Sequence, residues 1–100
     1  MQYTVRQSDN ALEIAISGQL TFTDAGQFPK VLAELANVPA TQWVFDLNGL
    51  EFIDSTGMSL FVHVYDEAMA KGMKAVLCNA HGVVRDALDR AGFATLFDLK

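Results

Sequence analysis

One short polar segment, Asp54-Ser55-Thr56-Gly57-Met58, carries the residue types best suited to chemistry. It follows the apolar run Trp43–Leu47 and a turn, and a long amphipathic stretch that predicts a helix comes directly after it. The Ser55 hydroxyl therefore lies at a helix N-terminus beside a carboxylate. Free N–H groups and a partial positive charge favour a phosphate at such a position. Ser55 is therefore a candidate for a phosphorylation switch, because a phosphate there would place about two negative charges at the rim of a surface.

The residues of this segment also have purely structural interpretations. Ser55 could cap the helix, a role compatible with phosphorylation. Asp54 either orients the Ser55 hydroxyl, or lies near a kinase's metal, or simply forms a turn. Gly57 costs the helix about 0.5–1 kcal/mol relative to alanine. Its bare backbone allows close approach of a partner, which we favour, or packing under the sheet edge. Met58 belongs to an apolar stripe and lies early enough to reach an interaction surface.

The chain offers no arrangement typical of an enzyme. His63 follows Ser55 by about two helical turns, or about 12 Å, so it cannot act as its base. His81 precedes a predicted helix and is interpreted as a surface or capping residue. Asp46 ends a strand as a receiver aspartate does, but the acidic pair and late lysine of a receiver are missing. The sequence contains no nucleophile elbow, phosphate-binding loop, dinucleotide fingerprint or His/Cys metal spacing. We therefore expect a binding module without catalytic activity, cofactor or metal.

Composition narrows the class of partner. The chain has 100 residues, of which 51% are hydrophobic, and its formal net charge is −5. This length predicts one domain, and the acidic balance argues against nucleic acid, which needs clustered Lys and Arg. The apolar runs are too short for membrane insertion, and the start of the chain lacks a signal-peptide pattern. The single Cys78 fits a reducing cytoplasm and is interpreted as a core residue.

Hydrophobic periodicity and turn residues predict alternating strands and helices in the order β-β-α-β-α-β-α-β. An antiparallel hairpin is expected over 2–8 and 11–17. The later strands are expected over Trp43–Leu47, Lys74–Cys78 and about Thr95–Leu99. The helices are expected over Ala25–Ala36 with Asp24 as cap, from Ser55 or Thr56 to Ala70, and over His81–Ala91.

This order predicts an α/β domain with a mixed, mostly parallel sheet of about five strands. The first strand should be an antiparallel edge, and three or more helices should cover mainly one face. The run Trp43–Leu47 should be buried on both faces. Three sets of apolar residues are expected to face the core: Phe28, Val31, Leu32 and Leu35 in the first helix; Met58, Phe61, Val62, Tyr65 and Met69 in the second; and Val84, Leu88 and Ala91 in the third.

Over essentially its whole length, residues 1–100, the chain resembles the STAS domain of bacterial anti-sigma factor antagonists. Gly18-Gln19-Leu20 is similar to the family's G-x-L, and Asp54–Met58 is similar to its D-S-[ST]-G-[LM]. The late helix and closing strand match in Val83–Leu88, Ala91-Gly92-Phe93 and Leu96-Phe97. A motif of four residues would be a weak signal by itself, but here it lies in register with the full order of elements.

The resemblance implies a phosphorylation switch. In this family a partner serine kinase of the GHKL type, often the anti-sigma factor itself, modifies the serine after the aspartate, and a PP2C-type serine phosphatase resets it. The unmodified protein binds the partner and so releases a sigma factor. Carried over, Ser55 is the acceptor, Thr56 is the neighbouring hydroxyl, and Asp54, Thr56, Gly57 and Met58 belong to the partner-binding surface.

The chain departs from the family pattern at three places, and two of these, Thr21 and Ser59, leave a second function open. Thr21 stands where many antagonists carry an acidic residue, Ser59 stands where many have glycine, and several relatives continue beyond Lys100 into another helix. STAS domains also serve as unphosphorylated subunits, for example docked on the ATPase of a lipid-transport ABC complex. That alternative uses the same helix end without a modification.

Overall fold

The sheet of this protein has the strand order β1-β2-β3-β4-β5. The computed structural model describes all residues, Met1–Lys100. In chain order the elements are β1 (Gln2–Ser8), β2 (Ala11–Leu20), the 3-10 helix η1 (Phe22–Asp24), α1 (Phe28–Ala36), β3 (Gln42–Ile53), α2 (Ser55–Ala70), β4 (Lys74–Cys78), α3 (Gly82–Arg90), the 3-10 helix η2 (Phe93–Thr95) and β5 (Asp98–Leu99). The predicted order of strands and helices is confirmed.

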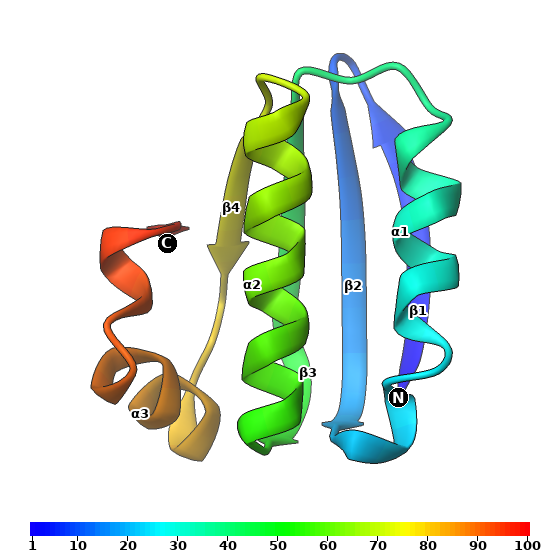
Figure 1. The fold of residues 1–100 in the computed structure, drawn as a ribbon. Coiled ribbons are helices and arrows are strands. Elements are labelled where there is room, and N and C mark those ends of the chain that lie inside the picture. The colour runs from blue at the N-terminus through cyan, green and yellow to red at the C-terminus, as the bar shows by residue number, and fades with distance from the viewer.

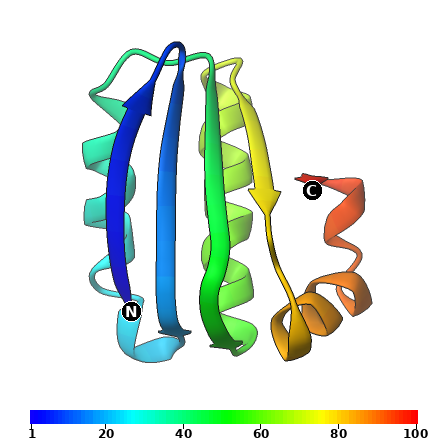
Figure 2. The same cartoon turned by 180° about the vertical axis from the view of Figure 1, so that it is seen from behind.

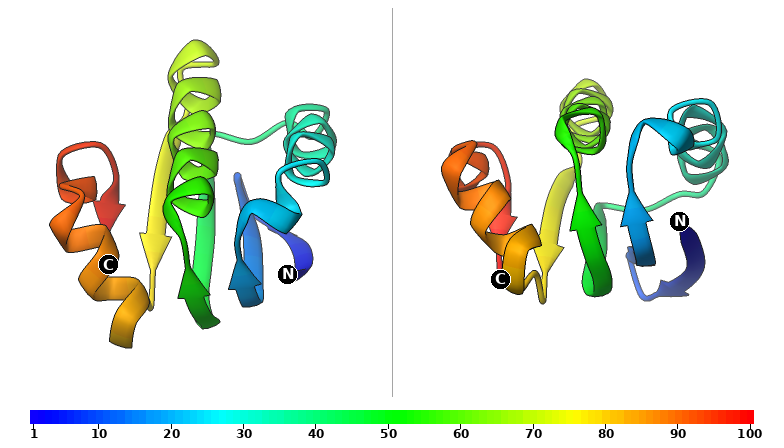
Figure 3. Two further views of the ribbon diagram at one scale, coloured as in Figure 1. Left: turned by 60° about the horizontal axis from the view of Figure 1, so that its bottom comes forward. Right: turned by 90° about the horizontal axis from the view of Figure 1, so that it is seen from below.

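The sheet is mixed, and the helices α1 and α2 lie on one of its faces (Figure 1). β1 pairs with β2 antiparallel, whereas the β2–β3, β3–β4 and β4–β5 pairs are parallel. α1 and α2 lie side by side in front of the sheet (Figure 1), and the opposite face carries no helix (Figure 2), whereas α3 lies beyond β4 at the edge of the sheet (Figure 3). The predicted α/β class, antiparallel edge strand and one-sided helix layer are therefore confirmed. No helix combines the length and the apolar character needed to cross a membrane.

The core fills the space between the sheet and the helices. Alternate residues of β2 and β3 point into it, among them Ile14, Trp43 and Phe45, none of which is exposed. At its centre the Phe61 ring of α2 meets Phe45 edge to face, with ring centroids 5.9 Å apart. It makes similar contacts with Phe28 and Phe97. Such aromatic pairs add about 0.5–1.5 kcal/mol each beyond their buried area. One side chain thus ties α1, β3 and the C-terminal segment to α2.

β3 differs from the prediction in length and in burial. It runs from Gln42 to Ile53, so the turn expected after Leu47 is wrong. Two register shifts against β2 absorb the extra residues, and pairing resumes at Gly49 and continues to Ile53. The expectation of burial on both faces is also wrong, because no helix covers the far face and Val44 and Asp46 are only half-buried there.

Cys78 lies on this open face rather than in the core. It pairs in register with Asp46 and is half-buried. Partial burial, together with the negative charges of Asp46 and Glu13, raises the pKa of the Cys78 thiol. The thiol therefore stays protonated and unreactive at neutral pH.

Two element boundaries and the burial of one residue also differ from the prediction. Asp24 does not cap α1, because its carboxylate binds groups at the start of the chain and of η1; α1 begins at Phe28, not Ala25. The last strand is only Asp98–Leu99, because Thr95 belongs to η2 and a turn at Leu96 and Phe97 separates η2 from the strand. Ala91 is exposed at the end of α3, although Val84 and Leu88 are buried as predicted.

The predicted core stripe of α2 is displaced by one residue. The buried residues are Gly57, Leu60, Phe61, Val64 and Ala68, so they have the expected spacing but a different phase. Val62 is 37% exposed and Met69 60% exposed, whereas Met58 and Tyr65 are partly buried. Apolar residues lie around most of this helix, so periodicity alone fits two rotations. The side of α2 that meets the sheet is fixed by the close contact of Gly57 with the end of β2.

A matched pair of substitutions tests this rotation. We expect Val64→Ala to lower the free energy of unfolding by about 2 kcal/mol, since it removes two methyl groups from a filled core. The same change two residues away, Val62→Ala, should stay within about 0.5 kcal/mol. Urea denaturation of both variants gives the comparison. Equal losses at the two positions would contradict the assigned face.

Candidate functional site at the start of helix α2

The candidate site lies where β2 and β3 end and α2 begins. Seen from below, the ends of these neighbouring parallel strands and the first turn of α2 meet at one edge of the molecule, with η1 beside them (Figure 3). Ser55 is the first residue of α2. The sequence segment predicted to carry chemistry is thus presented at an edge of the sheet.

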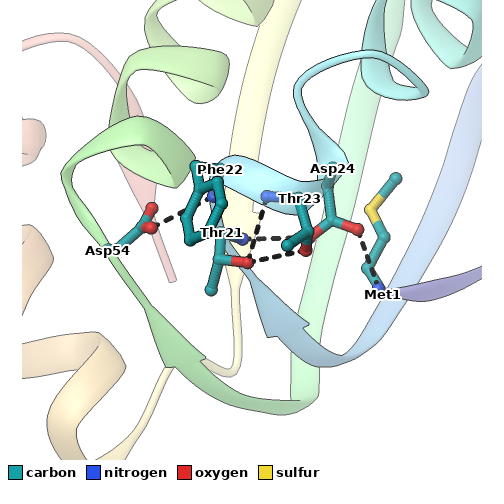
Figure 4. Close-up of polar contacts among 6 residues, drawn as sticks. All are labelled: Met1, Thr21, Phe22, Thr23, Asp24 and Asp54. Carbon is teal, nitrogen blue, oxygen red and sulfur yellow. Dashed lines mark hydrogen bonds and ion pairs between the residues drawn. The ribbon is translucent and has the colours of Figure 1, made fainter.

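Asp54, not Ser55, caps the helix. Its backbone is extended, and its Oδ1 accepts a hydrogen bond of 2.7 Å from the Gly57 N–H. Its Oδ2 accepts a second bond, 3.1 Å long, from the Phe22 N–H of η1 (Figure 4). Both carboxylate oxygens therefore bind backbone groups of the protein. This geometry matches a structural role for Asp54, and its contact with a partner stays a prediction.

Ser55 is exposed, and its hydroxyl makes no hydrogen bond within the chain. Only its carbonyl oxygen is engaged, accepting from the Ser59 hydroxyl at 3.1 Å. The neighbouring Thr56 is half-buried and faces the groove between α1 and α2. Because Asp54 already satisfies the cap, the Ser55 hydroxyl is free to accept another group, and the helix terminus provides a favourable electrostatic setting for a phosphate.

Gly57 is buried beneath the end of β2. A Cβ atom built at this position would overlap the Leu20 carbonyl oxygen and lie 2.7 Å from Ile53 Cγ1. The same Leu20 oxygen accepts the Asp54 N–H at 3.2 Å. Packing within the protein is thus sufficient to require glycine here. A contact between Gly57 and a partner is untested.

The loop before α1 is held by a charged network that the sequence did not reveal. Asp24, only 5% exposed, accepts the Thr21 N–H at 2.9 Å through Oδ2, and the N-terminal ammonium of Met1 lies 3.0 Å from Oδ1 (Figure 4). Thr21 Oγ1 in turn accepts the Thr23 N–H. Thr21, noted above as a departure from the family pattern, therefore caps η1. The capping-box spacing of Thr21 and Asp24 was the available signal.

Several apolar side chains are exposed in the elements that end or begin at this edge of the molecule. Phe22 is 71% exposed in η1, Phe52 is 45% exposed near the end of β3, and Val83 is 59% exposed in the first turn of α3. Met58 is half-buried in the first turn of α2. Exposed aromatic residues gathered at one edge are typical of a protein-binding surface. Sequence reasoning missed Phe22 and Phe52. Phe52 lies two residues before Asp54, which was a usable signal, whereas only the fold brings Phe22 to Asp54.

The histidines do not form a catalytic arrangement with Ser55. His81 Nε2 lies 2.7 Å from the Asn48 carbonyl oxygen, so this ring holds the start of α3 against β3. Nearby, Asp46 Oδ1 accepts from the Asn48 N–H and from the Asn79 amide, each at 3.0 Å. His63 lies farther along α2 in the groove beside α1. No group of three or more His, Cys, Asp or Glu residues is placed to hold a metal ion.

Replacing Gly57 tests the packing at the start of α2. In an ordinary helix Gly→Ala is stabilising by about 0.5–1 kcal/mol. Here we expect Gly57→Ala to lower the free energy of unfolding by about 1–3 kcal/mol, because the new methyl group overlaps the Leu20 carbonyl. Ser55→Ala in the same turn is the control and should stay within about 0.5 kcal/mol. A Gly57→Ala protein as stable as the parent in urea would contradict this packing.

The model of the STAS domain family matches residues 2–100 of the chain. Among solved structures, a putative anti-sigma factor antagonist from Thermotoga maritima superposes with a TM-score of 0.88 at 18% identity. The match covers 97% of this chain and 84% of the Thermotoga chain. The Bacillus cell fate determinant SpoIIAA in its phosphorylated form superposes with a TM-score of 0.73 at 18% identity. The match covers 99% of this chain and 91% of the SpoIIAA chain. The murine anion transporter Slc26a9 superposes with a TM-score of 0.74 at 18% identity. The match covers 87% of this chain and 14% of the transporter chain. A search of curated proteins finds no match. The fold, and a family model that spans nearly the whole sequence, show that this chain belongs to the STAS domain family.

Proposed function

We propose that this protein is an anti-sigma factor antagonist-like signalling module switched by phosphorylation of Ser55. In its unmodified form it binds a GHKL-type serine kinase that serves as the anti-sigma factor. Phosphorylation by that kinase releases the complex, and a PP2C-type serine phosphatase restores the binding form. The module performs no catalysis of its own and works in the cytoplasm.

The observation that carries this proposal is that Asp54, and not Ser55, caps helix α2. Asp54 supplies the cap, whereas the exposed Ser55 hydroxyl has no partner within the chain. A phosphate at Ser55 would therefore change the charge of the surface without breaking a contact of the fold. Helix N-termini also stabilise an added phosphate by the dipole and free N–H groups.

The apolar surroundings explain why such a charge would release a partner. Phe22, whose N–H binds Asp54, and Met58 in the first turn of α2 offer apolar contact area close to Ser55. An unpaired phosphate dianion buried against an apolar or acidic partner surface costs roughly 2–5 kcal/mol, or about 30- to several-thousand-fold in affinity. The same surface thus binds in one state and is repelled in the other.

Modification in the native host is the first test. We expect protein isolated from its host to show a species heavier by one phosphate in its intact mass, with the phosphate mapped to Ser55. The Ser55→Ala variant should lack it, whereas the control Thr56→Ala should retain it. Absence of phosphate under several growth conditions would contradict the switch.

Mimicry of the phosphate tests the binding step. We expect Ser55→Glu to lower affinity for the co-purifying kinase by at least about tenfold, because the charge enters an apolar contact. Its free energy of unfolding should stay within about 0.5 kcal/mol, since Ser55 supports no contact of the fold. Affinity is measured by calorimetry, with Ser55→Ala as the matched uncharged control. Unchanged affinity together with a large loss of stability would contradict the switch.

A second function stays open because Thr21 and Ser59 depart from the pattern of the antagonists. In this alternative the unphosphorylated protein docks constitutively on the ATPase of a lipid-transport ABC complex, or on another complex, through the same surface. Co-purification separates the two functions, because it yields either a transporter ATPase or a serine kinase.

A further inference from the structure

A groove lies between α1 and α2, and its lining includes Thr56 and Ser59 but not Ser55. Its volume is about 550 Å³. The floor is apolar and consists of Phe28, Leu32 and Leu60, each no more than 9% exposed. Between Thr56 and Glu67, the lining residues at its two ends, α2 rises about 17 Å, or three helical turns. The groove therefore has the length of a short helical segment.

The α1 wall of the groove is built from small residues. Ala33 and Ala36 line it together with Pro29, and Ala33 is exposed. Small side chains let a partner backbone approach α1 closely. Helix-in-groove recognition combines such a channel with apolar anchor residues spaced three or four apart on the ligand.

The other wall is negative at one end. Asp66 and Glu67 are exposed neighbours on α2 that line the groove, and neither forms an ion pair within the chain. α1 and α2 run in the same direction (Figure 1). α1 carries no basic residue in its last turn, so its negative end adds to this charge, whereas Lys71 stands at the C-cap of α2. Lys30 and Lys71 do not line the groove. His63 is its one other titratable group.

We propose that this groove binds an amphipathic basic helix of a protein partner. The apolar face of that helix would fill the floor over Leu32 and Leu60, and its Lys or Arg residues would lie against Asp66 and Glu67. Charge complementarity selects this occupant, because an acidic or neutral helix would leave the two carboxylates without a counter-charge.

The test uses two synthetic 14-residue peptides followed by ¹⁵N–¹H NMR of the full chain. One peptide places Leu on one helical face and Lys on the other, and the second replaces every Lys by Glu. We expect the basic peptide to shift resonances of α1 and α2 residues that line the groove, and the acidic peptide to leave them unchanged. Shifts spread over the open face of the sheet, or produced equally by both peptides, would overturn the proposal.

Two matched pairs of variants locate the binding. Ala33→Trp fills the groove and should abolish the shifts, whereas Ala94→Trp, at another exposed alanine, should not. The double variant Asp66→Lys/Glu67→Lys should weaken binding by at least about tenfold. Its control, Glu51→Lys/Asp86→Lys, makes the same change in net charge elsewhere and should weaken binding far less. Equal weakening by both double variants would overturn the assignment of the groove, and dispersed spectra verify that each variant is folded.

Discussion

The contact between Gly57 and the Leu20 carbonyl oxygen is the constraint on which the rest of the site depends. It brings the first turn of α2 against the end of β2, at a distance that no larger residue allows. The same oxygen accepts the Asp54 N–H, so the last residue before the helix is held at the same point. This close approach sets which residues of α2 face the sheet. It therefore places Leu60, Phe61 and Val64 in the core and turns Ser55 to the surface.

Asp54 extends this constraint to the loop before α1. One carboxylate oxygen accepts from the Gly57 N–H of the helix and the other from the Phe22 N–H, so Asp54 links η1 to the start of α2. Asp24 fixes η1 from the other side through Thr21 and the N-terminal ammonium. As a result, η1 is hydrogen-bonded at both of its ends, and the side chain of Phe22 is exposed close to Asp54. A surface of this kind binds with less ordering cost than a mobile one.

The two surfaces of α2 use opposite electrostatics. Its N-terminal end favours an added negative charge, and its C-terminal half presents carboxylates that favour a positive one. Asp66 and Glu67 lie about three turns from Ser55 and are well exposed, so screening limits their mutual influence.

The sequence by itself determined the order of elements, the α/β class, the antiparallel edge and the start of α2, because these depend on local periodicity and turn chemistry. It also singled out Ser55, since a hydroxyl beside Asp54 at a helix start is a local pattern. The sequence did not determine which side of α2 faces the sheet, because apolar residues lie around most of that helix. The contact of Gly57 with Leu20, which is distant in the chain, places Val64 rather than Val62 in the core. The tertiary structure likewise decided the roles of Asp54 and Asp24, whose hydrogen-bond partners Phe22 and Met1 come from elsewhere in the chain. Cys78 lies on a sheet face that is left open because the chain has too few helices to cover both faces. The number of helices is a property of the whole fold, so no local sequence pattern predicts it.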